Sequence, residues 1–288
     1  MSGLIQQQAG RRGASSTGAL CAAVGLARST HYRLRWRGPR REDRDGPARR
    51  AVVGVCRRWT VYGCRRVTAQ LRREGTPVGR ERVRRLMREE GLTVKPKRRF
   101  VRTTQSDHGE KVWPNLAKDF TPTGINQLWV ADLTYIALAR GFVYLAAILD
   151  AFSRRVIGWS LGATLEATLT IQALRMALST RTIAPGLIHH SDRGVQYACG
   201  DYVALLQEVG AAISMSRRST PTDNAQAESF MKTLKCEEVY LWDYADEADA
   251  RAHAADFIER VYNRERLHSA LGYLPPEEFE RKLASTVA

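Results

Sequence analysis

The sequence has little that would hold the chain in a membrane or brace it covalently. Its longest apolar run, FVYLAAIL at residues 142–149, is far shorter than the ~20 residues that cross a bilayer. The five cysteines form no CxxC pair, and none has a histidine at zinc-ligand spacing, so we expect reduced thiols. The first residues lack the apolar core of a signal peptide, and we therefore expect a cytoplasmic protein.

The charge of the chain is uneven. Net charge is +15, but residues 1–112 carry 28 Lys and Arg against 9 Asp and Glu, whereas residues 113–288 carry 17 against 21. A basic half joined to a mildly acidic half indicates nucleic acid held by the first half and acted on by the second. An acidic membrane surface is the rival partner. However, the arginines are spread over several predicted helices instead of one amphipathic face, which favours nucleic acid.

The basic half divides into short segments. Residues 1–17 have little to bury and are predicted to be a disordered tail. Residues 18–47 have a weak helix-turn-helix rhythm and then a charged, breaker-rich linker, GPRREDRDGP. A stronger helix-turn-helix pattern occupies residues 48–92, where three predicted helices end at glycines: Gly63, Gly75 and Gly91. Residues 93–122 are predicted to be a basic linker.

The third of these predicted helices has an arginine-rich outer face. Such a face behind a short turn is what docking into a DNA groove requires. The alternative is a solvated face on which the arginines pair with the glutamates of the same segment, but the arginines are in excess. We therefore expect DNA contacts from Arg80, Arg82, Arg84, Arg85 and Arg88.

From residue 123 to residue 288 the pattern becomes α/β. Three strand-like segments follow one another: NQLWVADLTYIALA, GFVYLAAILDAF and RRVIGWSLG. A helix, a strand, a helix, a strand and a helix come next, and the chain ends with further helices. This order predicts a mixed sheet with helices on its faces.

Three acids lie at positions where sheets of this kind place functional residues, at strand ends and helix starts or inside a buried strand. Asp132 lies inside an apolar strand, Asp192 ends the strand LIHHSD, and Glu228 lies on the helix TDNAQAESFMKTLK. Each could be a hydrogen-bonded structural residue, but as a set their carboxylates suit Mg²⁺ or Mn²⁺ and a two-ion phosphodiester site. Asp150 is a further candidate, for which we favour a turn-capping role.

The sequence motifs around these acids resemble those of one known family. WVADLTYI, LDAFSRRVIGW, HHSDRGVQY, DNAQAESFMKTLKCE and YNRERLHSALGYLPPEEF are similar to the OrfB transposase of the IS-three family of bacterial insertion sequences. That family has a DDE catalytic core like that of retroviral integrases, with an RNase H-like fold. YGCRRVTAQLRREG to RLMREEGL also resembles its helix-turn-helix segment, so the likeness runs from about residue 20 to residue 280.

The resemblance implies specific roles. Asp132, Asp192 and Glu228 would be the catalytic acids and the ligands of Mg²⁺ or Mn²⁺, two ions in all. Lys235, seven residues after Glu228 on nearly the same line of the helix, would contact DNA. Lys232 lies on the same helix and would also contact DNA. Asn224, His190 and His268 fall on family motifs, and for these three we leave open contact with DNA or structural hydrogen bonding.

The resemblance also implies an activity and partners. The chain would be a DNA transposase of the bacterial cytoplasm, associated with the nucleoid. It would cut insertion-sequence ends in double-stranded DNA and join them to target DNA. It would act in a homo-oligomeric synaptic complex, alone or with an OrfA protein or as a fusion to one. Two alternatives stay open: a non-catalytic DNA-binding relic acting as repressor or accessory factor, and an RNase H-like nuclease for RNA–DNA hybrids.

Overall fold

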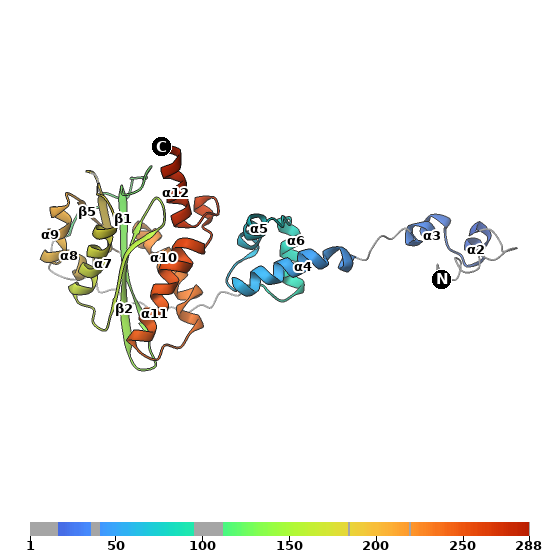
Figure 1. Ribbon diagram of the computed structural model, residues 1–288, viewed down its shortest axis with the longest axis horizontal. Coiled ribbons are helices and arrows are strands. Elements are labelled where there is room, and N and C mark those ends of the chain that lie inside the picture. The colour runs from blue at the N-terminus through green and yellow to red at the C-terminus, as the bar shows by residue number, and fades with distance from the viewer. Residues whose placement is uncertain (1–16, 36–40, 95–111, 184, 219, 288) are drawn as a thin grey trace.

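The computed structural model describes residues 17–35, 41–94, 112–183, 185–218 and 220–287. Along the chain these residues form a short helix pair, a three-helix domain and a sheet with its covering helices (Figure 1). The predicted tail at residues 1–16 and most of the predicted basic linker, residues 95–111, lie outside the described residues. None of the helices in the described ranges is long and apolar enough to cross a membrane.

The N-terminal helices follow the predicted pattern. After the pair α2 (Thr17–Ala23) and α3 (Arg28–Arg35) come α4 (Arg41–Arg58), α5 (Cys64–Arg73) and α6 (Arg80–Glu89). Gly75 and Gly91 follow α5 and α6 with φ of 74° and 68°, a conformation that glycine adopts without steric cost. Apolar residues of α5 and α6 form the centre of the three-helix domain: Val67, Leu71, Val83, Leu86 and Met87.

The prediction of a linker reaching residue 47 is wrong, because α4 already begins at Arg41 and runs through Gly46 and Pro47. The reason is a tertiary contact that outweighs local propensity. Asp45 is buried against α6, where it accepts hydrogen bonds from Arg82 and Arg85. Burying a carboxylate is costly unless it is paired, and the two arginines supply that pairing. Asp45, one of the charges taken for a linker, therefore fastens α4 to α6.

The second half is a five-stranded mixed sheet in the order β3-β2-β1-β4-β5. Strands β1 (Leu128–Ala137), β2 (Phe142–Asp150) and β3 (Val156–Gly162) are antiparallel neighbours, whereas β4 (Ile188–Ser191) runs parallel to β1, and β5 (Ala212–Met215) parallel to β4. This is the predicted α/β architecture of an RNase H-like integrase core. One face is covered by α7 (Ala167–Thr180), α8 (Val195–Ala198) and α9 (Gly200–Glu208), and the other by α10 (Ala225–Glu237) and α11 (Glu247–Ala255).

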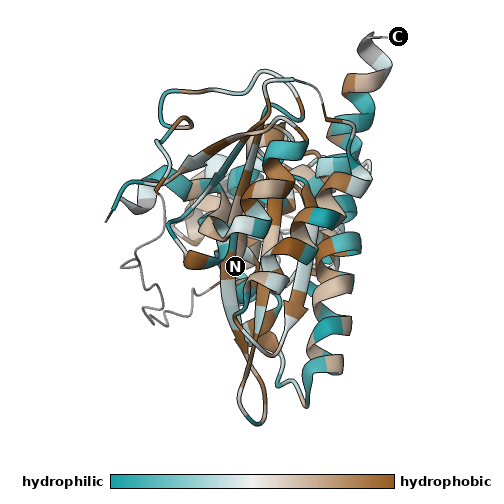
Figure 2. Ribbon diagram, turned by 90° about the vertical axis from the view of Figure 1, so that its left-hand side faces the viewer, coloured by the Kyte–Doolittle hydropathy of each residue, from teal (hydrophilic) through white to brown (hydrophobic). Residues whose placement is uncertain are grey.

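The two faces of β1 alternate as a strand's period of two requires. Trp129 and Ala131 pack under α7–α9, whereas Leu128 and Val130 pack under α10 and α11. Figure 2 shows the resulting layers, with strongly hydrophobic strands inside and hydrophilic residues on the outer helices. By this alternation, Asp132 belongs to the face that α10 covers.

The C-terminal segments join the sheet to the three-helix domain. Helix α11 continues into a π-helix, η3 (Asp256–Glu265), and α12 (Pro276–Val287) ends the described chain. Asn263 on η3 bonds both backbone groups of Val156 on the edge strand, at 3.0 and 2.9 Å. Just beyond η3, Leu267 enters the core of the three-helix domain, and its N–H donates to the Tyr62 hydroxyl at 2.8 Å. The two domains therefore share part of one hydrophobic core.

His189 on β4 gives the fold a defined sensitivity to acid. Its side chain is buried, its Nε2 lies 2.9 Å from the Tyr202 hydroxyl, and burial lowers its pKa to about 3. Below an unfolded-state pKa of about 6.5 the unfolded chain binds a proton that the folded chain does not, so acidification destabilises the fold. Between pH 7 and pH 5 this histidine should cost about 2 kcal/mol. In urea unfolding at both pH values, His189→Asn should lose less stability than the wild type by that amount, and an equal loss in both proteins would contradict the assignment.

Candidate active site

Asp132 is the first of the predicted acids, and the fold places it in an expensive position. It lies mid-strand on β1, opposite Ala147 of β2, and its Oδ1 accepts a hydrogen bond from the Leu133 N–H at 2.8 Å. Burial, then the negative charge of Asp192 and that of Glu228, raise its pKa to about 8. The ionised Asp132 carboxylate is therefore repelled by the other two acids, and a bound cation would relieve that repulsion.

Asp192 directly follows β4, the strand beside β1. Its Oδ1 accepts a hydrogen bond from the Gly194 N–H at 2.9 Å, which fixes the carboxylate at the strand's end. A Cβ on Gly194 would stand 3.0 Å from that same oxygen, so a glycine allows the turn to close tightly. Because β4 runs parallel to β1, its carboxyl end carries Asp192 towards Asp132.

Glu228 completes the set from above the sheet. It lies in the first turn of α10, where its side chain is exposed, and partial burial followed by the negative charge of Asp192 raises its pKa. The helix is anchored by Asn224, whose Nδ2 donates to the Ala131 carbonyl oxygen at 2.8 Å. Since Ala131 precedes Asp132 on β1, this bond brings the start of α10 directly over the acid on the strand.

Asp192 and Glu228 thus lie close enough to Asp132, and Asp192 close enough to Glu228, for their charges to raise the pKa values of Asp132 and Glu228. The three acids come from the middle of β1, the end of β4 and the start of α10. Their carboxylates do not meet in a finished cage, since no group of three or more His, Cys, Asp or Glu side chains in the described ranges has metal-holding geometry. The donor set itself is all carboxylate, which is the chemistry that Mg²⁺ and Mn²⁺ prefer.

Lys235 lies on the same side of α10 as Glu228. Its Nζ stands 4.3 Å from the centre of the Tyr135 ring on β1, a cation–π contact. Partial burial lowers its pKa, while the negative charge of Asp132 raises it. The structure thus places this ammonium group at the edge of the carboxylate set. Lys232, one turn before it, is exposed.

Of the two roles left open for His190 and Asn224, the structure shows the structural hydrogen bonding, because both side chains are interior. His190 is buried on β4, and its two ring nitrogens lie 2.8 and 3.0 Å from the hydroxyls of Ser214 and Ser216. Asn224 is 4 % exposed and uses its amide to dock α10. These residues position strands and helix. The turn-capping role expected of Asp150 is confirmed, since its Oδ1 accepts the N–H groups of Phe152 and Ser153.

Tyr197 is a residue of the site that sequence reasoning missed. It is buried in the core under α7–α9; burial raises its pKa well above 10, and Tyr202 and the charges of Asp192 and Asp132 raise it further. Its hydroxyl has no hydrogen-bond partner among the described residues. The position lies in the motif HHSDRGVQY, but nothing in that pattern separates a site tyrosine from a core tyrosine.

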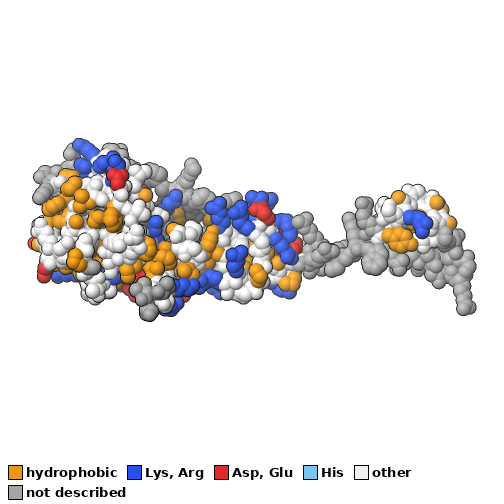
Figure 3. All heavy atoms as spheres, turned by 90° about the horizontal axis from the view of Figure 1, so that it is seen from above, with side chains coloured by type: hydrophobic (Ala, Val, Ile, Leu, Met, Phe, Trp, Pro, Cys, Tyr) orange, Lys and Arg blue, Asp and Glu red, His pale blue; other side chains and the backbone are white. Residues whose placement is uncertain are grey.

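The arginines of α6 divide into paired and unpaired groups. Arg82 and Arg85 bind Asp45, Arg85 also binds Glu89, and Arg84 binds Glu81 at 3.0 Å. Arg88 is exposed and makes no ion pair with any residue that the structure describes. Figure 3 shows Lys and Arg side chains gathered over the helical domain, with few acids beside them. The surface is basic overall, although its arginines are not equally available.

Comparisons with known proteins agree with this architecture. Two regions, residues 122–221 and 209–276, match models described as integrase core domain, and residues 42–100 match one described as HTH-like domain. An insertion element IS600 uncharacterized 31 kDa protein of Shigella sonnei is 39% identical over 266 residues, covering 91% of this chain and 98% of its own. Transposase InsF for insertion sequence IS3A of Escherichia coli (strain K12) is 37% identical over 272 residues, covering 92% and 93%.

Among solved structures, the catalytic core domain of BIV integrase is similar, with 18% sequence identity and a TM-score of 0.39. It covers 56% of this chain and 97% of its own.

Proposed function

We propose, from the premise that the chain belongs to the IS3 family of insertion-sequence transposases, that its three acids carry out DNA cleavage and strand transfer. The protein is a DNA transposase, a polynucleotidyl transferase with an integrase core. The residue assignment is supported by three acids that arrive from three separate elements: the negative charges of Asp192 and Glu228 raise the pKa of Asp132, and that of Asp192 raises the pKa of Glu228. Clustered acids with raised pKa values are a mark of functional sites.

The carboxylates would hold the metal ions on which this chemistry depends. Integrases and transposases of this family generally use divalent metals, and an all-carboxylate donor set suits Mg²⁺ or Mn²⁺. Two such ions, when bound, supply Lewis-acid activation of the attacking hydroxyl and neutralise charge on the leaving oxygen. Asp132 and Asp192 provide fixed ligands on the sheet, and Glu228 provides a more exposed one on α10.

The remaining residues would position DNA. Lys235 offers its ammonium group to a phosphate next to the scissile bond, and Lys232 extends the same line of the helix. The chain would first nick the transposon end and expose a 3′-hydroxyl, which then attacks a second phosphodiester in target DNA. Because two ends must be joined together, we expect a homo-oligomer, with or without an OrfA partner.

The test is an assay with labelled linear double-stranded DNA carrying the element's ends, with and without Mg²⁺. Metal-dependent nicking followed by joined products supports the proposal. Binding without any cleavage would indicate a DNA-binding relic. Cleavage confined to an RNA–DNA hybrid would indicate an RNase H-like nuclease. Either of the last two results would overturn strand transfer as the activity.

The unpaired Arg88 gives a test of the helical domain as the DNA-binding part. Arg88→Ala should weaken binding of any duplex by about 3- to 10-fold near 0.1 M salt and reduce the slope of log K against log [salt] by about 1. Its melting temperature should not change, because no ion pair with a described residue is lost. Arg85→Ala is the contrasting variant: it removes a partner of the buried Asp45 and should lower the melting temperature. Unchanged DNA affinity in Arg88→Ala would contradict a contact there.

A further inference from the structure

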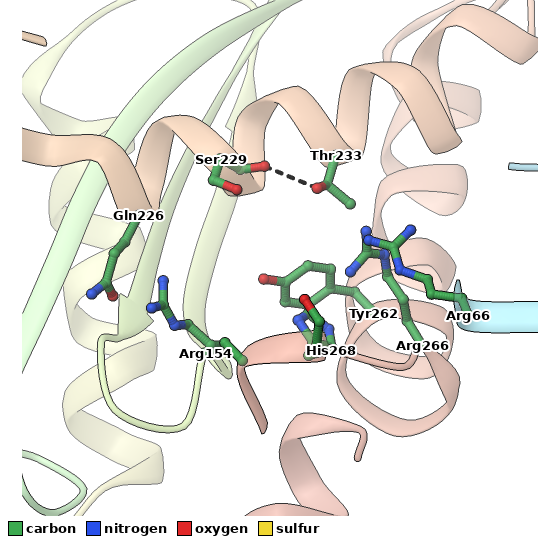
Figure 4. A pocket seen from close by; sticks show the side chains of 10 residues that line it. Arg66, Arg154, Gln226, Ser229, Thr233, Tyr262, Arg266 and His268 are labelled. Carbon is green, nitrogen blue, oxygen red and sulfur yellow. Dashed lines mark hydrogen bonds between the residues drawn. The ribbon is translucent and has the colours of Figure 1, made fainter. Parts of the chain in front are cut away.

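A second polar site lies on the opposite side of α10 from Lys235. It is a hollow of about 170 Å³ between α5, α10, the turn after β2 and the segment around the end of η3 (Figure 4). A single water needs only about 10–15 Å³ by the same measure, so the hollow has room for a polyatomic ion. The residues that matter for its chemistry are Arg66, Arg154, Gln226, Tyr262, Arg266 and His268.

The charges in this Arg154 pocket do not balance. Glu237 takes Arg266 in a two-bond contact at 2.7 Å and also binds Arg66 at 3.2 Å. Arg154, the third guanidinium, has no side-chain hydrogen bond or ion pair with any described residue. Burial lowers its pKa, as expected for a cation that lacks a partner. Three cations therefore share one carboxylate, and the pocket keeps an excess of positive charge.

The backbone at Arg154 is strained. Its φ is 62°, a left-handed conformation that costs a non-glycine residue of order 1–3 kcal/mol. The turn is enforced by Asp150, whose carbonyl oxygen accepts the Arg154 N–H at 2.8 Å and whose carboxylate holds the next turn residues. In Figure 4 the Arg154 guanidinium stands between Gln226 and Tyr262, and those of Arg66 and Arg266 lie together beyond the Tyr262 ring. Backbone strain of this kind collects at functional positions.

Polar atoms in the pocket are left without partners. His268 Nε2 and Gln226 Oε1 are buried and have no hydrogen bond among the described residues. Burial, then the positive charges of Arg266 and Arg66, lower the pKa of His268 to about 3. An anion in the pocket would cancel that repulsion, and a rotated Gln226 amide would offer it N–H donors. Buried polar atoms are normally hydrogen-bonded, so the pocket can offer these two groups to a polar ligand.

We propose that the Arg154 pocket binds a phosphate group of the DNA backbone, at a point separate from the three acids. Forked guanidinium groups match phosphate oxygens in geometry and charge. DNA is the expected source because the pocket joins α5 of the helical domain to α10, the helix that carries Glu228. A phosphate held there would fix the helical domain and the catalytic helix on one duplex. The choice of DNA rests on the proposed function, whereas the anion site rests on the pocket alone.

The informative variant is Arg154→Asn, because asparagine tolerates the left-handed backbone while the guanidinium and its charge are removed. In the full-length protein it should bind a fluorescent duplex about 5- to 20-fold more weakly near 0.1 M salt, and the salt slope should fall by about 1. It should melt at or above the wild-type temperature, since a partly buried cation that has no ion pair with a described residue is removed. The matched control is Arg175→Asn, an exposed arginine on α7 across the sheet, which should leave DNA affinity unchanged.

Two added measurements separate the sources of phosphate and the two proposals. In thermal unfolding, inorganic phosphate should raise the melting temperature of the wild type less than duplex DNA does. Both increases should be smaller in Arg154→Asn. If only inorganic phosphate depended on Arg154, DNA would be the wrong ligand. If the wild type joins strands and Arg154→Asn binds DNA normally, the pocket proposal fails alone. If Arg154→Asn loses affinity but the wild type never cuts DNA, the pocket stands and strand transfer fails.

Discussion

Asp192→Asn and Glu228→Gln are each expected to reduce DNA cleavage and strand transfer by more than about 1000-fold. Each change removes a negative ligand and keeps the size of the side chain, so the loss falls on cation binding and on charge balance in the transition state. The measurement is the rate of nicking and joining of labelled ends at saturating Mg²⁺. DNA affinity in the absence of metal should stay within about 3-fold of the wild type, because the helical domain is untouched.

The same chemical changes at exposed acids are the controls. Asp201→Asn and Glu208→Gln on α9 should cut and join DNA like the wild type.

Asp132→Asn adds a second readout: it should be inactive and yet melt at a higher temperature in metal-free buffer at neutral pH. Its carboxyl has a pKa of about 8 in the fold against about 3.9 unfolded, so the folded state is penalised as pH rises between those values. A gain of ~1 kcal/mol would raise the melting temperature by about 2–4 °C. Strand transfer by Asp192→Asn would sink the assignment.

The sheet could be predicted from the sequence because each strand is a short apolar run bounded by turn residues. Buried strands bounded by turns, followed by alternating helices and strands, leave few other architectures. The acids could also be singled out, since a carboxylate inside an apolar strand such as Asp132 is costly unless it is paired or bound to a cation. Its pairing with Glu228 rested on resemblance to a family, because nothing local relates positions almost a hundred residues apart.

The features that the sequence left open or got wrong share one physical cause, which is burial decided by distant contacts. The role of His190 was open between DNA contact and structural hydrogen bonding, and serines on and just after β5 take both of its ring nitrogens. The supposed linker at Asp45 became helical through arginines some forty residues later. The Arg154 pocket was invisible for the same reason, since it draws on parts of the chain from α5 to η3. Local propensity and periodicity carry no record of such long-range pairing.

Gly158→Ala is expected to be the most destructive single change outside the acids, lowering the free energy of unfolding by at least about 3 kcal/mol. Gly158 lies mid-strand on β3, directly beneath α7. A Cβ there would stand 2.2 Å from the Ala173 carbonyl oxygen and 2.7 Å from the Ala177 nitrogen. These are backbone atoms of a helix, so no rotamer change relieves the clash. The helix would have to lift off the sheet and open the core beneath it.

The neighbouring Gly162 is a matched control on the same strand. A Cβ at that position meets only a methyl group of Leu169 at 3.5 Å, which is ordinary contact with a flexible side chain. Gly162→Ala should therefore unfold within about 1 kcal/mol of the wild type. Urea unfolding and soluble yield measure both variants, and strand transfer should fall with the folded fraction only in Gly158→Ala. A Gly158→Ala protein as stable as Gly162→Ala would show that α7 does not press on β3 as closely as its backbone distances state.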